Sequence, residues 1–307
     1  MPNATYDLHL HTHWSYDATA SVAYYFRCAQ RLNLRCIAIT EHHTVDSLPE
    51  VLELAPKKPE VAVIPSAELS VTTSGGAAID MVCLGLPVTP VGELRTVLDL
   101  YHQWQCDYGA SVSAGLQALG YDYSDKRRLE LLETYRPRKT IDVQGITHVQ
   151  NGIQRKYFVA EGFMESEDGY GPLLRRAAEH VPQPPYPAAA RVIPAVQNAG
   201  GLAIIAHPTG YFARNDRRRM DALREELGFD GIECAHTSIP HDLTPVYRAY
   251  CEEHGLLSSA GSDCHADPAD NPYGIAPQNA LGQHIGEDVW LDELLERVNP
   301  LPNAPAT

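Results

Sequence analysis

The first residues of the chain place three histidines at alternating positions, in the stretch Tyr6-Asp7-Leu8-His9-Leu10-His11-Thr12-His13. Residues 6–11 have the pattern of a short strand, and residues two apart on a strand face the same side. His9 and His11 would therefore point into one space, where two imidazoles can bind a metal ion. Taken alone, the stretch could also be a histidine-rich tail that binds nothing in particular.

Imidazoles and carboxylates also follow other apolar runs. Residues 36–40, 61–65, 202–206 and 256–260 read as buried strands, and metal-ligand side chains come after each of them. With the first stretch, the strand-end candidates are His9, His11, Asp17, His42, Glu68, His207, Asp263 and His265. This mixture suits zinc, manganese or iron rather than a cysteine-rich structural site. The set exceeds what one tetrahedral ion needs, so two or three ions sharing a carboxylate would use it, bind a phosphate and activate water.

Strands and helices alternate over residues 1–89 and 191–299. Helices are expected at 22–32, with Ser21 as N-cap and Asn33 as the left-handed end, and at 188–198, 217–227 and 243–254; further strands are expected at 79–86 and 231–235. This alternation predicts an α/β fold with parallel strands, and active sites of barrel-type α/β folds lie at the carboxyl ends of the strands. Residues 300–307 are Pro/Ala-rich and predict a loose tail.

Residues 90–190 have a different character. Helical patterns dominate, clearest at 94–104 and 129–135, and tyrosines and basic residues are frequent. The segment ends in the proline-rich stretch 181–187, which is typical of a boundary. It is either an insertion or lid over the site, or an ordinary helical subdomain with solvated charges.

The composition limits the class of protein. The 307 residues are 44% hydrophobic and 21% charged, with a net charge of −15, which argues against non-specific attraction to nucleic acid or to an anionic membrane. Apolar runs of the ~20 residues that span a bilayer are absent, and so is a signal peptide, so a cytoplasmic location is expected. The seven cysteines form no C-x-x-C motif, so neither a disulfide framework nor a zinc finger is expected.

The motifs as a set resemble the PHP family, named for polymerase and histidinol phosphatase domains. The matching pieces are residues 7–12 with Ser15-x-Asp17, then 39–42, Glu68, 206–208 and Gly261-Ser262-Asp263-x-His265. The resemblance implies a distorted seven-stranded (β/α)7 barrel with a mainly helical insertion, up to three metal ions, and phosphoester hydrolysis. By position, His9, His11, Glu68 and Asp263 would hold one ion and Asp17, His42 and His265 another. Glu68 would bridge to a third held with His207.

The middle segment resembles a branch of this family that dephosphorylates nucleoside 3′,5′-bisphosphates and trims short RNA from its 5′ end. The shared marks are residues 146–149, which include His148, and 199–203 before His207.

Three positions depart from the pattern. Val82 stands where the family commonly has a histidine, and Asp80, two residues earlier on the same strand face, is the candidate replacement. Glu41 replaces an aspartate and would either reposition His42 or reach the metals. Ile146 stands where the branch favours an arginine that contacts phosphate.

These observations predict a metal-dependent phosphoesterase that uses one to three zinc, manganese or iron ions. Glu68, His207 and Asp263 are the expected catalytic residues, and His148, His236 and Arg214 the expected substrate contacts. His13 is a weaker candidate, and His102, His180, His254 and His284 are expected at the surface. The substrate would be a phosphomonoester or phosphodiester of a small molecule, with a nucleotide or short oligonucleotide as the specific expectation. A hydrolase of a C–N or C–O bond on the same barrel, and a PHP module that binds without turnover, remain open alternatives.

Overall fold

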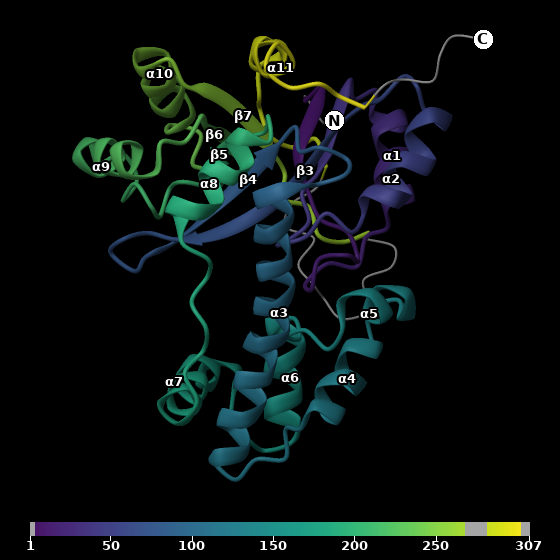
Figure 1. The fold of residues 1–307 in the computed structure, drawn as a ribbon, viewed down its shortest axis with the longest axis vertical. Helices are drawn as coiled ribbons and strands as arrows, with labels where there is room; N and C mark the ends of the chain where they lie inside the picture. Colours follow the sequence, from purple (N-terminus) through teal and green to yellow (C-terminus); the bar gives the residue numbers. More distant parts are fainter. Residues whose placement is uncertain (1–3, 268–280, 302–307) are drawn as a thin grey trace.

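The computed structural model describes residues 4–267 and 281–301, so most of the expected loose tail, from residue 302 on, lies outside the described residues. Within these ranges one sheet holds its strands in chain order (Figure 1). The strands are β1 (Tyr6–Leu10), β2 (Cys36–Ile39), β3 (Ala62–Thr72), β4 (Ala78–Leu84), β5 (Leu202–Ile205), β6 (Gly231–His236) and β7 (Leu257–Gly261). After β7, the N–H of Asp263 donates to the carbonyl of His9 over 2.8 Å, and the N–H of His11 donates to Cys264 over 2.9 Å. These bonds join the two ends of the sheet into a nearly closed barrel.

The strand β4 corrects the expectation of parallel strands. It runs antiparallel to both β3 and β5, while the other neighbouring pairs are parallel. The link between β3 and β4 is short and contains Gly75 and Gly76, the latter with a φ of 83°. A parallel neighbour needs a crossover of a dozen or more residues, so a turn of this length can only make a hairpin.

The strand β3 is also longer than expected. It continues past residue 65 to Thr72, so Glu68 lies within the strand and not after its end. The polar residues Ser66, Glu68 and Ser70 interrupt the apolar run, yet all three are buried. Glu68 lies opposite Val82 in the β3–β4 pairing, and Ser70 lies opposite Asp80. The strand pairing therefore places Glu68 and Asp80 on one face of this hairpin.

The helices surround the barrel and form a separate layer at one end of it. Their bounds are α1 (Val22–Leu32), α2 (Leu48–Leu54), α3 (Gly92–Ala118), α4 (Asp125–Glu133), α5 (Arg138–Gln144), α6 (Asn151–Ala160), α7 (Tyr170–His180), α8 (Ala189–Asn198), α9 (Arg217–Leu227), α10 (Thr244–His254) and α11 (Asp288–Leu295), with short 3-10 turns η1 (Ala55–Lys57) and η2 (Glu167–Gly169). In Figure 1, α9 and α10 lie on one side of the barrel and α1 and α2 on the other. The Ser21 cap and the left-handed Asn33 are confirmed, since Ser21 Oγ accepts from the N–H of Tyr24 and Asn33 has a φ of 56°.

The helix α3 links the barrel to the helical layer. It spans 27 residues, far beyond the expected 94–104, and runs from the barrel down to α4, α6 and α7 (Figure 1). Its far end packs in a separate apolar cluster that includes Val112, Leu116 and Phe158. The division of the chain at 89/90 and 190/191 stays a prediction. Among the described residues, no helix combines the length and the apolarity needed to cross a membrane.

Two side chains tie the helical layer to the loop after β1. The guanidinium of Arg136 donates to the carbonyls of His13 and Trp14, and the hydroxyl of Tyr135 donates to the carbonyl of Tyr16 over 2.6 Å. Arg136 is buried, and both of its terminal guanidinium nitrogens donate within the fold. The loop that carries Tyr16 and Asp17 is thus held between the barrel and the helices.

Candidate metal centre

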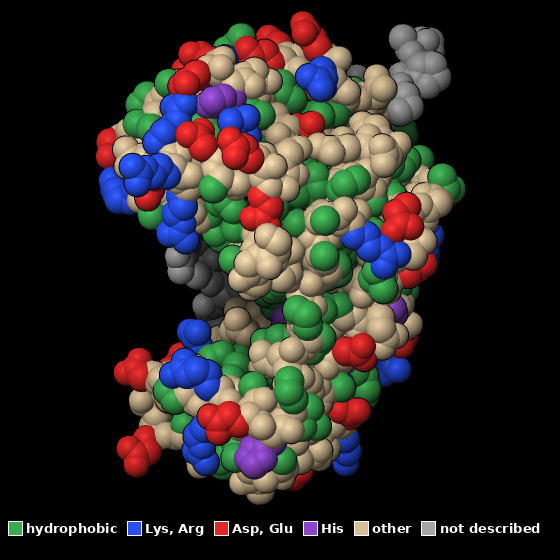
Figure 2. All heavy atoms as spheres, turned by 60° about the vertical axis from the view of Figure 1, so that its left-hand side comes forward, with side chains coloured by type: hydrophobic (Ala, Val, Ile, Leu, Met, Phe, Trp, Pro, Cys, Tyr) green, Lys and Arg blue, Asp and Glu red, His purple; other side chains and the backbone are tan. Residues whose placement is uncertain are grey.

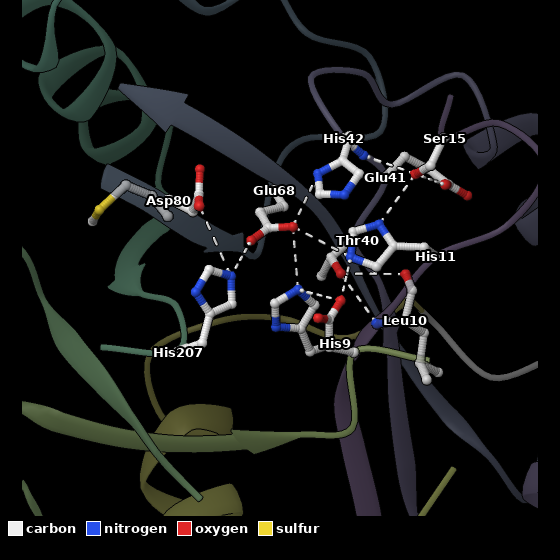
Figure 3. A network of polar contacts seen from close by, with 12 residues as sticks. His9, Leu10, His11, Ser15, Thr40, Glu41, His42, Glu68, Asp80 and His207 are labelled. Carbon is white, nitrogen blue, oxygen red and sulfur yellow. Dashed lines mark hydrogen bonds and ion pairs between the residues drawn. The ribbon is translucent and has the colours of Figure 1, made fainter. Parts of the chain in front are cut away.

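Four side chains from three parts of the chain meet inside the barrel: His9, His11, Glu68 and Asp263. His9 Nε2 lies 3.2 Å from Glu68 Oε2 and 3.5 Å from Asp263 Oδ1, and His11 Nε2 lies 3.3 and 3.2 Å from the same two oxygens. Figure 3 shows the two rings and the carboxylate of Glu68 converging. Ligands about 2.0–2.1 Å from a tetrahedral zinc lie about 3.3–3.4 Å from one another. The observed spacing is therefore that of ligands around one ion.

A second group lies on the solvent side of His11. His42 Nε2 and His265 Nε2 lie 3.3 and 3.5 Å from Asp17 Oδ2. The rings of His42 and His265 both stack against the ring of His11, with centroids 4.2 and 4.3 Å from it and 5.7 Å from each other. His42 Nδ1 also lies 3.1 Å from Glu68 Oε2, which connects this group to the first. We call the two groups without Glu68 the imidazole-rich half, which comprises His9, His11, Asp17, His42, Asp263 and His265.

A third group, the Asp80 site, comprises Glu68, Asp80 and His207. His207 Nε2 lies 3.1 Å from Glu68 Oε1 and 3.9 Å from Asp80 Oδ2. Val82 is 1% exposed and belongs to the apolar core, so it contributes no ligand. Glu68 is shared, because its Oε2 faces the imidazole-rich half and its Oε1 faces His207 (Figure 3).

Two buried carboxylates orient the imidazoles of His9, on β1, and of His11, which directly follows β1. Glu233, on β6, accepts from His9 Nδ1 over 3.0 Å and from the N–H of His207 over 2.7 Å. Glu41 accepts from the hydroxyl of Ser15 over 2.6 Å, and Ser15 Oγ lies 3.1 Å from His11 Nδ1. With Nδ1 used as a donor, each ring turns the lone pair of Nε2 toward Glu68 and Asp263.

Buried atoms in the centre test whether a metal fits. His9 Nε2, His11 Nε2 and Glu68 Oε2 are buried and make no aligned hydrogen bond with any described residue, although both ring nitrogens lie within 3.3 Å of that oxygen. Buried polar atoms without partners are rare because the lost hydration is costly. The convergence of these atoms on one point and the mixed imidazole and carboxylate donors fit a divalent transition metal.

The pKa values in the metal-free protein follow from burial and opposed charge. Burial raises the pKa of Glu68, but the imidazoles of His9 and His42 outweigh it and hold the pKa well below the ordinary value. Burial lowers the pKa of His265, yet Asp17 and Asp263 raise that pKa to about 9. For His207, burial is likewise outweighed by the hydrogen bond to Glu68, and its pKa rises to about 9. In the metal-free protein, the imidazoles with a raised pKa are protonated and form ion pairs with these carboxylates.

The centre is closed on one side and open on the other. The side chains of His9, His11 and Glu68 are at most 1% exposed, whereas those of Asp17, His42, Asp263, His265, His207 and Asp80 are 16–29% exposed. The backbones of His207 and Asp263 adopt positive φ values of 29° and 57°. Residues other than glycine avoid this backbone region unless their surroundings impose it. The hydrogen bonds from the His207 N–H to Glu233 and from the Asp263 N–H to His9 impose it here.

Residues 7–170, more than half of the chain, match the family model of the PHP domain. The chain belongs to the PHP domain family. A 3′,5′-nucleoside bisphosphate phosphatase of Chromobacterium violaceum is 25% identical over 280 residues, which cover 86% of this PHP protein and 88% of the relative.

Two solved structures share the fold. One, from Bifidobacterium adolescentis and provisionally named a metal-dependent phosphoesterase, has a TM-score of 0.72 and 21% identity, with 98% of each chain covered. The other, an amidohydrolase of Chromobacterium violaceum described with bound sulfate and no metal, has a TM-score of 0.70 and 20% identity, with 99% and 100% covered. The two structures show the fold. The family match and the phosphatase relative identify the PHP protein as a metal-dependent phosphoesterase, which is a hydrolase.

The structure brings all nine predicted metal-ligand residues into these three groups, and His236 joins them. His236 Nε2 lies 3.6 Å from Asp263 Oδ2 and has no hydrogen-bond partner among the described residues. His148 lies nearby in a layer of aromatic rings, beside Tyr16 at 3.7 Å between centroids.

Arg214 is exposed and forms an ion pair with Asp242 over 3.2 Å, so its role as a substrate contact stays a prediction. Other expectations need correction. Glu41 does not reach the ligands, because its oxygens accept from Thr12 and Ser15. His13 packs against Trp14 and faces Glu50. His284 is 3% exposed and faces Asp7 Oδ2 at 3.7 Å, so it is not a surface residue.

Sequence reasoning missed Glu233 and the role of Ser15. Glu233 lies within the apolar strand β6, three residues before His236, and a carboxylate at a fully buried strand position is the signal that could have found it. Ser15 was recognised within a motif, but its contacts with His11, Glu41 and the N–H of His42 depend on three separate segments.

Proposed function

We propose that this PHP protein removes a phosphate from a nucleotide, with a nucleoside 3′,5′-bisphosphate or a short oligonucleotide as the preferred substrate class. The observation that supports this is the position of Tyr16. Its ring lies 5.4 Å from the ring of His42 in the metal centre and 3.7 Å from the ring of His148. A substrate whose phosphate lies at the metals would therefore have aromatic rings within reach of its base.

These rings form what we call the aromatic wall: Tyr16, Trp104, Tyr108 and His148. His148 contacts Tyr108 edge-on at 5.0 Å, and Trp104 contacts Tyr108 at 5.1 Å. Burial lowers the pKa of His148 to about 3, so the ring is neutral at neutral pH. Its Nδ1 has no hydrogen-bond partner among the described residues. Aromatic rings stack on any nucleobase, and a neutral imidazole can also exchange a hydrogen bond with its edge.

The residues of the centre would have different roles in the reaction. Divalent ions in such a centre bind phosphate oxygens and activate a water molecule for attack. Glu68, Asp263 and His207 would be the catalytic residues that hold the reacting groups in line. Asp263 directs Oδ1 toward His9 and His11, and Oδ2 toward His236. Asp263 Oδ2 would orient the attacking water, and His236 Nε2 would donate to an oxygen of the phosphoryl group.

The surface charge favours a small substrate. On the face shown in Figure 2, Lys and Arg side chains alternate with Asp and Glu side chains over both the barrel and the helical layer. A long nucleic acid needs a continuous basic track, because its affinity comes mainly from phosphate contacts. A cytoplasmic location and the identity of the ion, zinc, manganese or iron, stay predictions.

Phosphate release from a substrate panel tests the proposal. The panel would contain adenosine 3′,5′-bisphosphate, AMP, a 5′-phosphorylated trinucleotide, glucose 6-phosphate and histidinol phosphate. We expect the highest kcat/KM for the bisphosphate or the trinucleotide, and loss of activity in Asp263→Asn. Sugar phosphates or histidinol phosphate at equal or higher kcat/KM would refute the nucleotide assignment. Hydrolysis of amides without release of phosphate from any substrate would refute the phosphoester assignment.

A further inference from the structure

His43 carries a buried imidazole at the junction of the barrel and α3. Its backbone has a φ of 63°, a left-handed conformation that residues other than glycine rarely adopt. The N–H of His43 donates to the carbonyl of Glu68 over 2.8 Å, which holds the backbone in this conformation. The residue is 2% exposed, so the ring is directed into the protein and not toward solvent.

Aromatic side chains surround the ring of His43 and connect it to the aromatic wall. The ring stacks on Tyr101 with 5.1 Å between centroids and 5° between the planes, and it meets Trp104 edge-on at 5.0 Å. Tyr186 lies 5.4 Å from the same ring and is only half-buried, so this group of rings reaches the protein surface. Because Trp104 belongs to the aromatic wall, His43 continues that wall toward the barrel.

The hydrogen bonds of Ser70 determine which nitrogen of His43 carries the proton. Ser70 donates its only hydroxyl hydrogen to Asp80 Oδ1, so its oxygen is an acceptor toward His43 Nε2, which lies 2.9 Å away. Burial, together with His42 and His148, holds the pKa of His43 well below its ordinary value, so the ring is neutral at neutral pH. The proton of the neutral ring therefore lies on Nε2, and Nδ1 keeps a free lone pair.

This lone pair lacks a donor. His43 Nδ1 is buried and has no hydrogen-bond partner among the described residues. Leaving a buried acceptor unpaired is costly, so a ligand that brings an N–H to this atom would be favoured. A ligand that enters between aromatic rings must also be flat, as a nucleobase is. Adenine and cytosine carry an amino group where guanine and thymine carry an oxygen, and an oxygen would face the lone pair without a hydrogen.

We propose that His43 is a base-reading residue, which selects nucleotides whose base carries an exocyclic amino group, as adenine and cytosine do. The base would stack on the aromatic wall and donate an amino hydrogen to His43 Nδ1. This inference rests on the proposed nucleotide phosphatase function and names the class of base that this function prefers.

Two substitutions at position 43 separate the roles of the two ring nitrogens. Glutamine can place its amide near the position of Nε2 and still donate to Ser70, but it has no polar atom near the position of Nδ1. Asparagine is shorter, so it can place its amide oxygen near the position of Nδ1 but loses the contact with Ser70. It also tolerates the left-handed backbone.

The preference for the amino group is measured as a ratio of two kcat/KM values. One substrate is adenosine 3′,5′-bisphosphate, and the other is purine riboside 3′,5′-bisphosphate, which lacks only the amino group. The ratio does not depend on how much of a preparation is folded. We expect the wild type to prefer the adenine substrate by about tenfold or more, since the other substrate leaves a buried acceptor unpaired. His43→Gln should abolish this preference and His43→Asn should retain most of it.

His102→Gln, at an exposed position on α3, is the control and should keep the wild-type ratio. Base reading would be refuted by a wild type without preference, by a preference that His43→Gln retains, or by equal loss in both variants at position 43. In each of these cases phosphate release from nucleotides would still stand. Absence of phosphate release from every nucleotide tested would instead refute the proposed function itself.

Discussion

Ser15 donates its hydroxyl hydrogen to Glu41 Oε2 over 2.6 Å. A serine hydroxyl has one hydrogen, so its oxygen is an acceptor toward its other neighbours. These neighbours are His11 Nδ1 at 3.1 Å and the N–H of His42 at 2.9 Å. Glu41 thus determines, through Ser15, which ring nitrogen of His11 carries the proton and which faces the metal centre.

Ser15→Ala should weaken metal binding in the imidazole-rich half. Loss of an outer-shell partner typically costs 10–100-fold in affinity, roughly, and that range is expected here. The variant also leaves the buried carboxylate of Glu41 with one donor fewer, at a cost of about 1–3 kcal/mol in the free energy of unfolding. Competition with a fluorescent zinc chelator measures the affinity. Ser74→Ala, in the exposed β3–β4 turn, is the matched control, and equal zinc affinity in the two variants would contradict the role of Ser15.

Glu233→Gln should impair both His9 and His207. The glutamate accepts two hydrogen bonds, one on each oxygen. A glutamine has one acceptor oxygen, and its amide nitrogen would face a second N–H donor. We expect roughly 10–100-fold weaker metal binding and about 1–3 kcal/mol lower stability in urea unfolding. Glu179→Gln, on the exposed surface of α7, should change neither quantity. Unchanged metal affinity in Glu233→Gln would show that His9 does not need this carboxylate.

Metal uptake should release protons at neutral pH. The pKa values of His207 and His265 are about 9 in the metal-free protein, because neighbouring carboxylates outweigh the effect of burial. Both rings are then protonated at pH 7 and must lose their protons to bind a metal. Calorimetric titration with Zn²⁺ in buffers of different ionisation enthalpy should show more than one proton released per chain at pH 7, and fewer above pH 9. Heats that do not depend on the buffer would contradict this.

The same pKa values fix the sign of the effect on stability without metal. Since the folded-state pKa is raised, the contribution of these histidines is fully present below their ordinary pKa of 6.5 and is lost as pH rises through about 9. Thermal unfolding of the metal-free protein between pH 6 and 10 should show this fall.

Gly261→Ala should disturb the metal centre through the backbone. A Cβ at this last residue of β7 would lie 2.2 Å from the Cβ of His9, much closer than two carbons can approach. The strands must separate, so we expect about 1–3 kcal/mol loss of stability, typical of overpacking, together with weaker zinc binding. Gly210→Ala has open space around the added methyl group and serves as the control. Wild-type stability and zinc affinity in Gly261→Ala would contradict the close approach.

His148→Ala should raise KM for nucleotides and leave p-nitrophenyl phosphate hydrolysis unaffected. Stacking of one base on an aromatic side chain contributes about 1–3 kcal/mol, and the loss should appear mainly in KM. Steady-state kinetics with the two substrates separates base recognition from chemistry. His102→Ala, exposed on α3, is the control. Equal losses of kcat for both substrates would assign His148 to the metal centre and not to the base.

Much of the metal centre was predictable from local pattern. Strand alternation placed His9 and His11 on one face, and the polar residues after β2, β5 and β7 indicated His42, His207, Asp263 and His265. The structure brings these side chains together, and their positions could be predicted because period and strand ends are short-range properties of the chain. The same rule indicated Glu68 after the apolar run 61–65, although the structure places it inside β3, which continues to Thr72.

The sequence by itself therefore determined which ligand types the chain has and that parallel strands would bring them together. Only the tertiary structure decided how the ligands are oriented and divided. The hydrogen bonds of Glu233 to His9 and of Ser15 to Glu41 join residues 224 and 26 positions apart, and the antiparallel β4 sets Asp80 beside Glu68. Such contacts depend on which strands become neighbours, and the spacing of residues along the chain does not specify that.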